Sequence, residues 1–84
     1  MTSAERTTWQ IYAGVVADTL GFLSPLHMVA MEAGAGSDKA ADRISSGQEF
    51  WKLQPEQIIR LEAALAAARV NPIRTVLQHQ GPMP

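Results

Sequence analysis

The sequence predicts an all-α protein, a compact bundle of four to five short helices. Apolar residues recur at intervals of three and four along most of the chain, which is the period of an amphipathic helix. Ser, Pro and Gly stand where such segments begin and end, as they do at helix boundaries. No stretch shows the alternation of a half-buried strand, and no internal repeat is visible.

Length and composition narrow the class of protein further. The chain has 84 residues, so we expect a single helical domain over residues 1–84. A chain this short buries only roughly 60% of the surface that its unfolded form exposes, which makes a lone monomer marginally stable. The chain contains no Cys, which excludes disulfides, thiolate metal sites and a cysteine nucleophile. The formal net charge of −1 lacks the basic excess typical of nucleic-acid binders.

The most apolar segment, residues 11–31, is long enough to span a bilayer but does not have the composition of a membrane helix. It contains Asp18, Pro25 and His27. An acid at the bilayer centre costs about 2.5 to 3.5 kcal/mol, and Pro removes a backbone donor. The N-terminal residues also lack the basic and apolar regions of a secretory signal. We therefore expect no membrane association and a cytoplasmic location.

The first helix is predicted to begin at Thr2, which with Glu5 forms a capping-box pattern, and to end at Ser24–Pro25. Its apolar stripe consists of Trp9, Tyr12, Val16, Leu20 and Leu23. The stripe is widened by Ile11, Val15 and Phe22, so several neighbouring elements must cover this helix. Small residues repeat at Ala13, Ala17 and Gly21, where another helix can approach closely.

The next two helices are marked by their caps. Ser24 is a good N-cap and Pro25 suits the first helical position, while Gly34 suits the C-terminal end. The buried face of this second helix is predicted to contain Leu26, Val29, Ala30 and Ala33. Residues 34–37 form a short flexible connector, and Ser37 caps a third, more polar helix that stops at residues 45–47.

The fourth helix is predicted to open at Pro55 and to be the strongest helix of the chain, because an alanine-rich run follows. Its buried stripe is predicted to contain Ile58, Leu61, Leu65 and Ala68. A last short helix, with Ile73, Val76 and Leu77 on its apolar side, precedes a C-terminal tail at residues 81–84.

No residue constellation predicts catalysis. The two histidines are His27 and His79, and Glu32 lies five positions from His27 and does not share its helix face, so no acid–base or nucleophile constellation is visible. Asp38 and Asp42 share a face, but basic residues flank both, so internal ion pairs explain them. We expect a protein that is not an enzyme and that holds no metal and no cofactor.

The apolar residues instead predict a binding surface. Met28 and Met31 lie close together on a helix whose other faces are already apolar, and Met is common both as a gap-filler and on adaptable binding surfaces. Phe50 and Trp51 are adjacent, so their rings point in different directions; one can face outward as an interface anchor, or both can lie in the core. The predicted partner-binding residues are Trp9, Met28, Met31, Phe50 and Trp51.

This excess of apolar surface is typical of a protein–protein interface. The sequence therefore predicts a small interaction module, either a self-associating subunit or an adaptor or inhibitor that docks on a larger partner. Its partner would be another protein or a second copy of itself.

The alternative is a helix-turn-helix-like DNA-binding protein, because short helices separated by tight breaks fit that outline. Arg60, Arg69 and Arg74 gather toward the C-terminal half. A recognition helix presents several Arg, Lys, Asn or Gln side chains, whereas the helix from Pro55 offers only Gln57 and Arg60 among alanines. Nucleic acid is therefore the weaker expectation.

One segment resembles a known pattern. Residues 50–56 read Phe-Trp-Lys-Leu-Gln-Pro-Glu and resemble the Phe-Trp, Leu, Thr-Pro, Glu pattern of some small phage tail-assembly chaperones, in which the segment also leads into a helix. The resemblance covers seven residues, and Gln54 stands in place of the Thr. It fits a binding protein from a compact genome, a phage or bacterial accessory protein, and no specific function is carried over from it.

Overall fold

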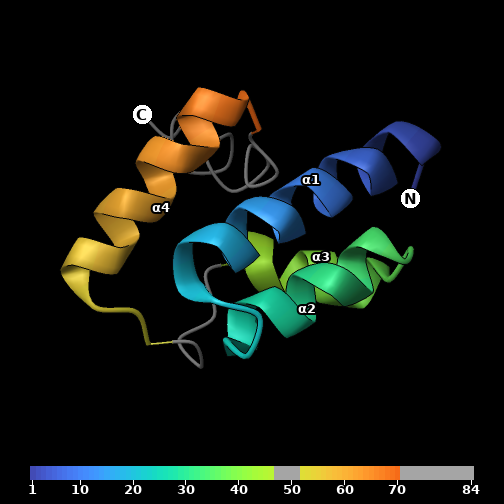
Figure 1. The fold of residues 1–84 in the computed structure, drawn as a ribbon. Coiled ribbons are helices and arrows are strands. Elements are labelled where there is room, and N and C mark those ends of the chain that lie inside the picture. The colour runs from blue at the N-terminus through green and yellow to red at the C-terminus, as the bar shows by residue number, and fades with distance from the viewer. Residues whose placement is uncertain (47–51, 71–84) are drawn as a thin grey trace, which may run out of the picture.

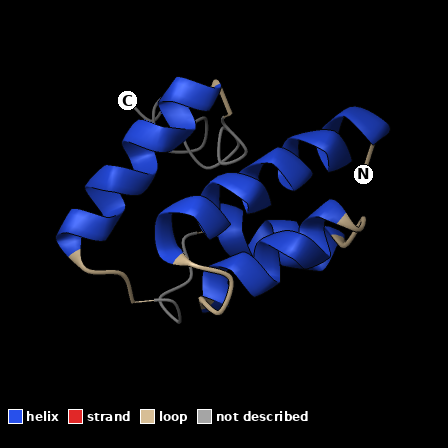
Figure 2. Ribbon diagram, viewed as in Figure 1, coloured by secondary structure: helices blue, strands red, loops and turns tan. Residues whose placement is uncertain are grey.

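The computed structural model describes residues 1–46 and 52–70 (Figure 1). These residues form four helices: α1 (Ser3–Leu20), α2 (Pro25–Gly34), α3 (Asp38–Ser45) and α4 (Pro55–Ala68). Within the described ranges there is no strand (Figure 2). The predicted all-α bundle of short helices is confirmed. The predicted last helix and the tail at 81–84 lie outside the described residues.

The centre of the fold is an antiparallel hairpin of α1 and α2, which lie side by side (Figure 1). α3 packs against α2, and α4 packs against α1. Small residues line the contact between the helices, and Val16, Ala30 and Ala33 are fully buried. Of the residues predicted to allow a close approach, Ala13 and Ala17 are buried on α1, whereas Gly21 lies beyond its end. The helices also come close at Gly34, where an added Cβ would come 2.9 Å from Cγ of Gln10 on α1.

α1 begins as predicted but ends early. The Thr2 hydroxyl accepts a hydrogen bond from the Glu5 amide at 3.1 Å, and the Glu5 carboxylate accepts one from the Thr2 amide at 2.7 Å. The helix was expected to continue to Ser24, which is wrong: it ends at Leu20, and Gly21 has a φ of +95°. Gly adopts this conformation without steric cost, so the chain turns there.

The first residues of α2 and α3 confirm the predicted N-caps, whereas Gly34 lies inside the end of α2 and Ala35 is its C-cap. The Ser24 hydroxyl accepts a hydrogen bond from the His27 amide at 3.1 Å, and the Ser37 hydroxyl accepts one from the Ala40 amide at 3.1 Å. Between the two helices lies a three-residue turn, in which Gly36 has a φ of +109°. Backbone hydrogen bonds from the turn to the last residues of α2 fix its path.

α4 starts at Pro55 as predicted, but its predicted buried stripe is only partly correct. Leu61 is buried and Leu65 is half-buried, whereas Ile58 and Ala68 are exposed. Among the described helices α4 packs substantially only against α1, so only a narrow face of it is covered. No helix in the described ranges is long and apolar enough to cross a bilayer.

Candidate protein-binding surface

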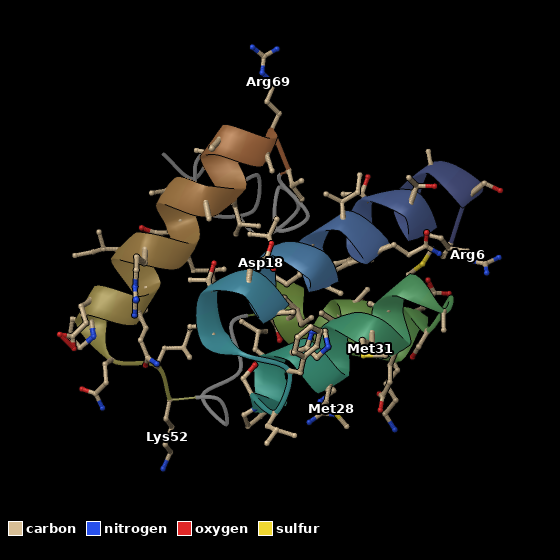
Figure 3. The ribbon with its side chains drawn as sticks, in the orientation of Figure 1. Arg6, Asp18, Met28, Met31, Lys52 and Arg69 are labelled. Atoms are coloured by element: carbon tan, nitrogen blue, oxygen red, sulfur yellow. The ribbon has the colours of Figure 1, made fainter. Side chains whose placement is uncertain are left out.

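The outer side of the α1–α2 hairpin carries a group of exposed residues, most of them with apolar side chains, which we call the hairpin face. It consists of Ile11, Gly14, Asp18, Phe22, Leu23, Met28 and Met31, all of them exposed. On α1, residues 11, 14 and 18 follow the i, i+3, i+7 spacing of one helix face, and on α2 residues 28 and 31 do the same. Asp18, Met28 and Met31 lie on the same side of the molecule (Figure 3).

Phe22 and Leu23 are exposed because α1 stops before them. The sequence placed Leu23 in the buried stripe of α1 and Phe22 beside it, which is wrong: Phe22 is 71% exposed and Leu23 is 93% exposed. Once the helix ends at Leu20, the period of 3.6 residues no longer decides which way these side chains point. The Phe22 ring packs edge-on against His27, with ring centroids 5.4 Å apart.

Met28 and Met31 lie on the face of α2 that turns away from the core. Met28 is 55% exposed and Met31 is 54% exposed, while Leu26, Ala30 and Ala33 on the opposite side of the same helix are buried. Unbranched thioether side chains adapt to partners of different shapes. Both methionines therefore occupy positions from which the predicted partner contact is possible.

Hydrogen bonds across the hairpin hold this face in one geometry. His27 is buried, and its Nδ1 lies 3.1 Å from the carbonyl oxygen of Ala13. A carbonyl only accepts, so Nδ1 carries the proton and donates it. About one turn earlier on α1 and two turns later on α2, Nε2 of Gln10 donates to the Gly34 carbonyl at 2.9 Å. The two contacts fix the register of α2 on α1.

The charged side chains that α1 and α2 carry after Arg6 are of one sign. No Lys or Arg occurs from residue 7 to residue 38, whereas Asp18 and Glu32 are both exposed. Within residues 1–46 and 52–70 neither carboxylate has an ion-pair or hydrogen-bond partner. The face is therefore apolar with an acidic border.

The other predicted binding residues lie elsewhere. Trp9 is 5% exposed and belongs to the core, where its ring meets Tyr12 edge-on at a centroid distance of 5.3 Å. It shares the buried stripe of α1 with Tyr12 and Val16, so it offers little surface to a partner. Phe50 and Trp51 lie outside the described residues. Phe22 and Leu23 were missed as surface residues, although Gly21 is a sequence signal for the end of α1.

Two other kinds of site find little support. In the described part of the chain no group of three His, Asp or Glu residues could hold a metal ion. α2 and α3 are joined by a turn as short as that of a helix-turn-helix, but the exposed side chains of α3 are Asp38, Lys39, Asp42 and Arg43. Two acids beside two bases give no net attraction to phosphate. DNA binding stays a prediction, and the charges of α3 do not favour it.

Comparison with known proteins adds no relative: no protein-family model, no curated protein and no solved structure matches this chain.

Proposed function

We propose that this chain is a small, non-enzymatic protein–protein interaction module that docks on a partner protein through the hairpin face. The observation that carries the proposal is the exposure of four large apolar side chains on one hairpin: Phe22 and Leu23 in the α1–α2 turn, and Met28 and Met31 on α2. Single exposed apolar residues are normal on any protein, but a contiguous group of large ones is typical of an interface.

The arrangement suits an adaptor or inhibitor that binds a larger protein in the cytoplasm. An aromatic ring beside flexible methionines provides an anchor with adaptable surroundings, which is how binding energy concentrates in a few residues of an interface. Hydrogen bonds between α1 and α2 hold the hairpin beneath, so little backbone conformational entropy is lost when a partner binds. The resemblance of residues 50–56 to tail-assembly chaperones fits the same class of role.

The test is capture of partners by the tagged protein from its host's extract, followed by mass spectrometry, with matched variants. The double substitution Met28→Ser, Met31→Ser removes apolar area from the hairpin face without entering the core. Ile59→Ser on α4 is the control, because Ile59 is 68% exposed but lies far from the hairpin face in sequence and on a different helix. Loss of two hot-spot contacts of about 2 kcal/mol each corresponds to a loss of affinity of well over tenfold.

We expect the double variant to lose a stoichiometric partner that wild type and Ile59→Ser retain, with unchanged helicity by circular dichroism. Retention of the partner by the double variant would contradict the proposal. Recovery of nuclease-sensitive material alone would instead support the DNA-binding alternative.

A further inference from the structure

We infer that the partner segment is a cationic amphipathic helix, one whose apolar stripe is bordered by Lys or Arg. This inference rests on the proposed function and adds the chemistry of the partner. Its basis is the one-signed charge at the border of the hairpin face, where Asp18 stands on the α1 side and Glu32 on the α2 side.

The two acids are placed where the border of a docked helix would lie. Asp18 shares a helix face with Gly14, one turn before it, and follows Ile11 by seven residues. Glu32 is four residues after Met28 and therefore its neighbour on the surface of α2. Each helix of the hairpin face thus carries one exposed carboxylate that the described part of the chain leaves without a cationic partner.

A partner that presents a helix fits the hairpin face better than a partner that presents a flat surface. Gly14 is exposed, and a Cβ built on it would meet nothing within 4 Å, so the α1 backbone is bare at this position. A helix laid there would place side chains of its i, i+3, i+4, i+7 stripe against the methionines and Phe22. Lys and Arg beside that stripe would cover the apolar border with their methylene stems and reach the carboxylates with their charged ends.

The same charges disfavour a second copy of this chain as the occupant. A symmetric contact brings the same patch of both copies together, which would set acid against acid without any Lys or Arg from residues 7–38. The other exposed apolar group, Ile58 and Ile59 on α4, has Arg60 beside it but also Glu56 and Glu62. This group therefore lacks the excess of positive charge that would complement Asp18 and Glu32 on the hairpin face.

The test measures the binding of two fluorescent peptides to the full chain by fluorescence anisotropy. Both peptides follow one amphipathic pattern of about 14 residues, long enough for a marginal helix, with Leu on one face and either Lys or Glu on the other. The measurement is made at low salt and at about 1 M salt, where the Debye length falls to about 3 Å. The variant Asp18→Asn, Glu32→Gln removes the acidic border, and Glu56→Gln, Glu62→Gln on α4 is the control with the same change in net charge.

We expect the Lys peptide to bind at least about tenfold more tightly than the Glu peptide at low salt, with the difference reduced at high salt. The Asp18→Asn, Glu32→Gln variant should weaken Lys-peptide binding about three- to tenfold, and the α4 control should leave it unchanged. Met28→Ser, Met31→Ser should weaken binding of the Lys peptide as well, because the apolar contact is shared.

Each contrary outcome has a distinct meaning. Equal weakening by both charge variants would overturn the inference, because it would show attraction to net charge alone. Equal affinity for the two peptides, lost in the methionine variant, would overturn the cationic partner but leave the proposed docking face intact. Failure of both peptides to bind, or self-association of the chain that the methionine variant abolishes, would likewise overturn the inference. The capture of partners from host extract would then test the proposed function independently of the peptide measurements.

Discussion

Tyr12 places an ionisable phenol in the core, where it is 4% exposed and packs against Trp9. Burial raises the pKa of Tyr12 to about 12, because the phenolate would lose its hydration. The unfolded chain releases this proton near its ordinary pKa of 10.0. The stabilisation from the neutral phenol is therefore complete below pH 10 and is lost as the pH rises from 10 to 12, by up to about 2 to 3 kcal/mol.

The prediction can be checked directly because Tyr12 is the only tyrosine in the sequence. Near-ultraviolet absorbance should show tyrosinate forming near pH 12 in the folded protein and near pH 10 in denaturant. Urea unfolding should lose stability between these two pH values, and Tyr12→Phe should remove that part of the loss. A folded-state midpoint near 10 would mean that the phenol is not buried.

At the scale of single residues, the sequence predicted the core better than it predicted the surface. Trp9 was predicted to belong to both the helical stripe and the binding surface, and its periodicity with Tyr12 and Val16 placed it correctly in the core. Leu23 satisfied the same periodicity but is exposed, because a period applies only while the helix continues.

At the scale of elements, the close contact of α1 with α2 depends on small side chains. Ala17 is buried on α1, and Leu in its place would need room that the packed hairpin does not have. We expect Ala17→Leu to lower the free energy of unfolding by about 1 to 3 kcal/mol, measured by urea unfolding with circular dichroism.

The matched control is Ala63→Leu, the same substitution at an exposed position within α4. It should change stability by less than about 0.5 kcal/mol. Similar effects of the two substitutions would show that α1 and α2 are not packed as closely as the structure places them.

Helix starts were predictable, since Thr2, Ser24 and Ser37 all accept the capping hydrogen bonds that their sequence positions predict. Two features were not. Whether Gly21 ends a helix or lies within it depends on its φ, which the sequence pattern leaves open. Which side of α4 is buried depends on how many neighbours it has, and the described helices offer it substantial packing only with α1.

At the scale of the whole molecule, composition predicted more apolar surface than a small bundle can bury, but not its location. Within residues 1–46 and 52–70, most of the exposed large apolar side chains belong to the hairpin face or are the isoleucines of α4. The net charge of −1 likewise conceals an uneven distribution of charge: residues 7–34 contain two acids, Asp18 and Glu32, and no Lys or Arg. Both distributions depend on which helices pair, which no local pattern encodes.

The most direct test of the central claim, that the hairpin face docks on a protein, is peroxide footprinting of Met28 and Met31 by mass spectrometry. Hydrogen peroxide converts an accessible thioether to the sulfoxide, so the rate reports whether each sulfur is covered. We predict that isotope-labelled protein oxidises at both residues in buffer, that native host extract slows this several-fold, and that heat-denatured extract with matched peroxide consumption does not. Equal rates at both methionines in buffer and in native extract would show that the face stays open, and would contradict the account.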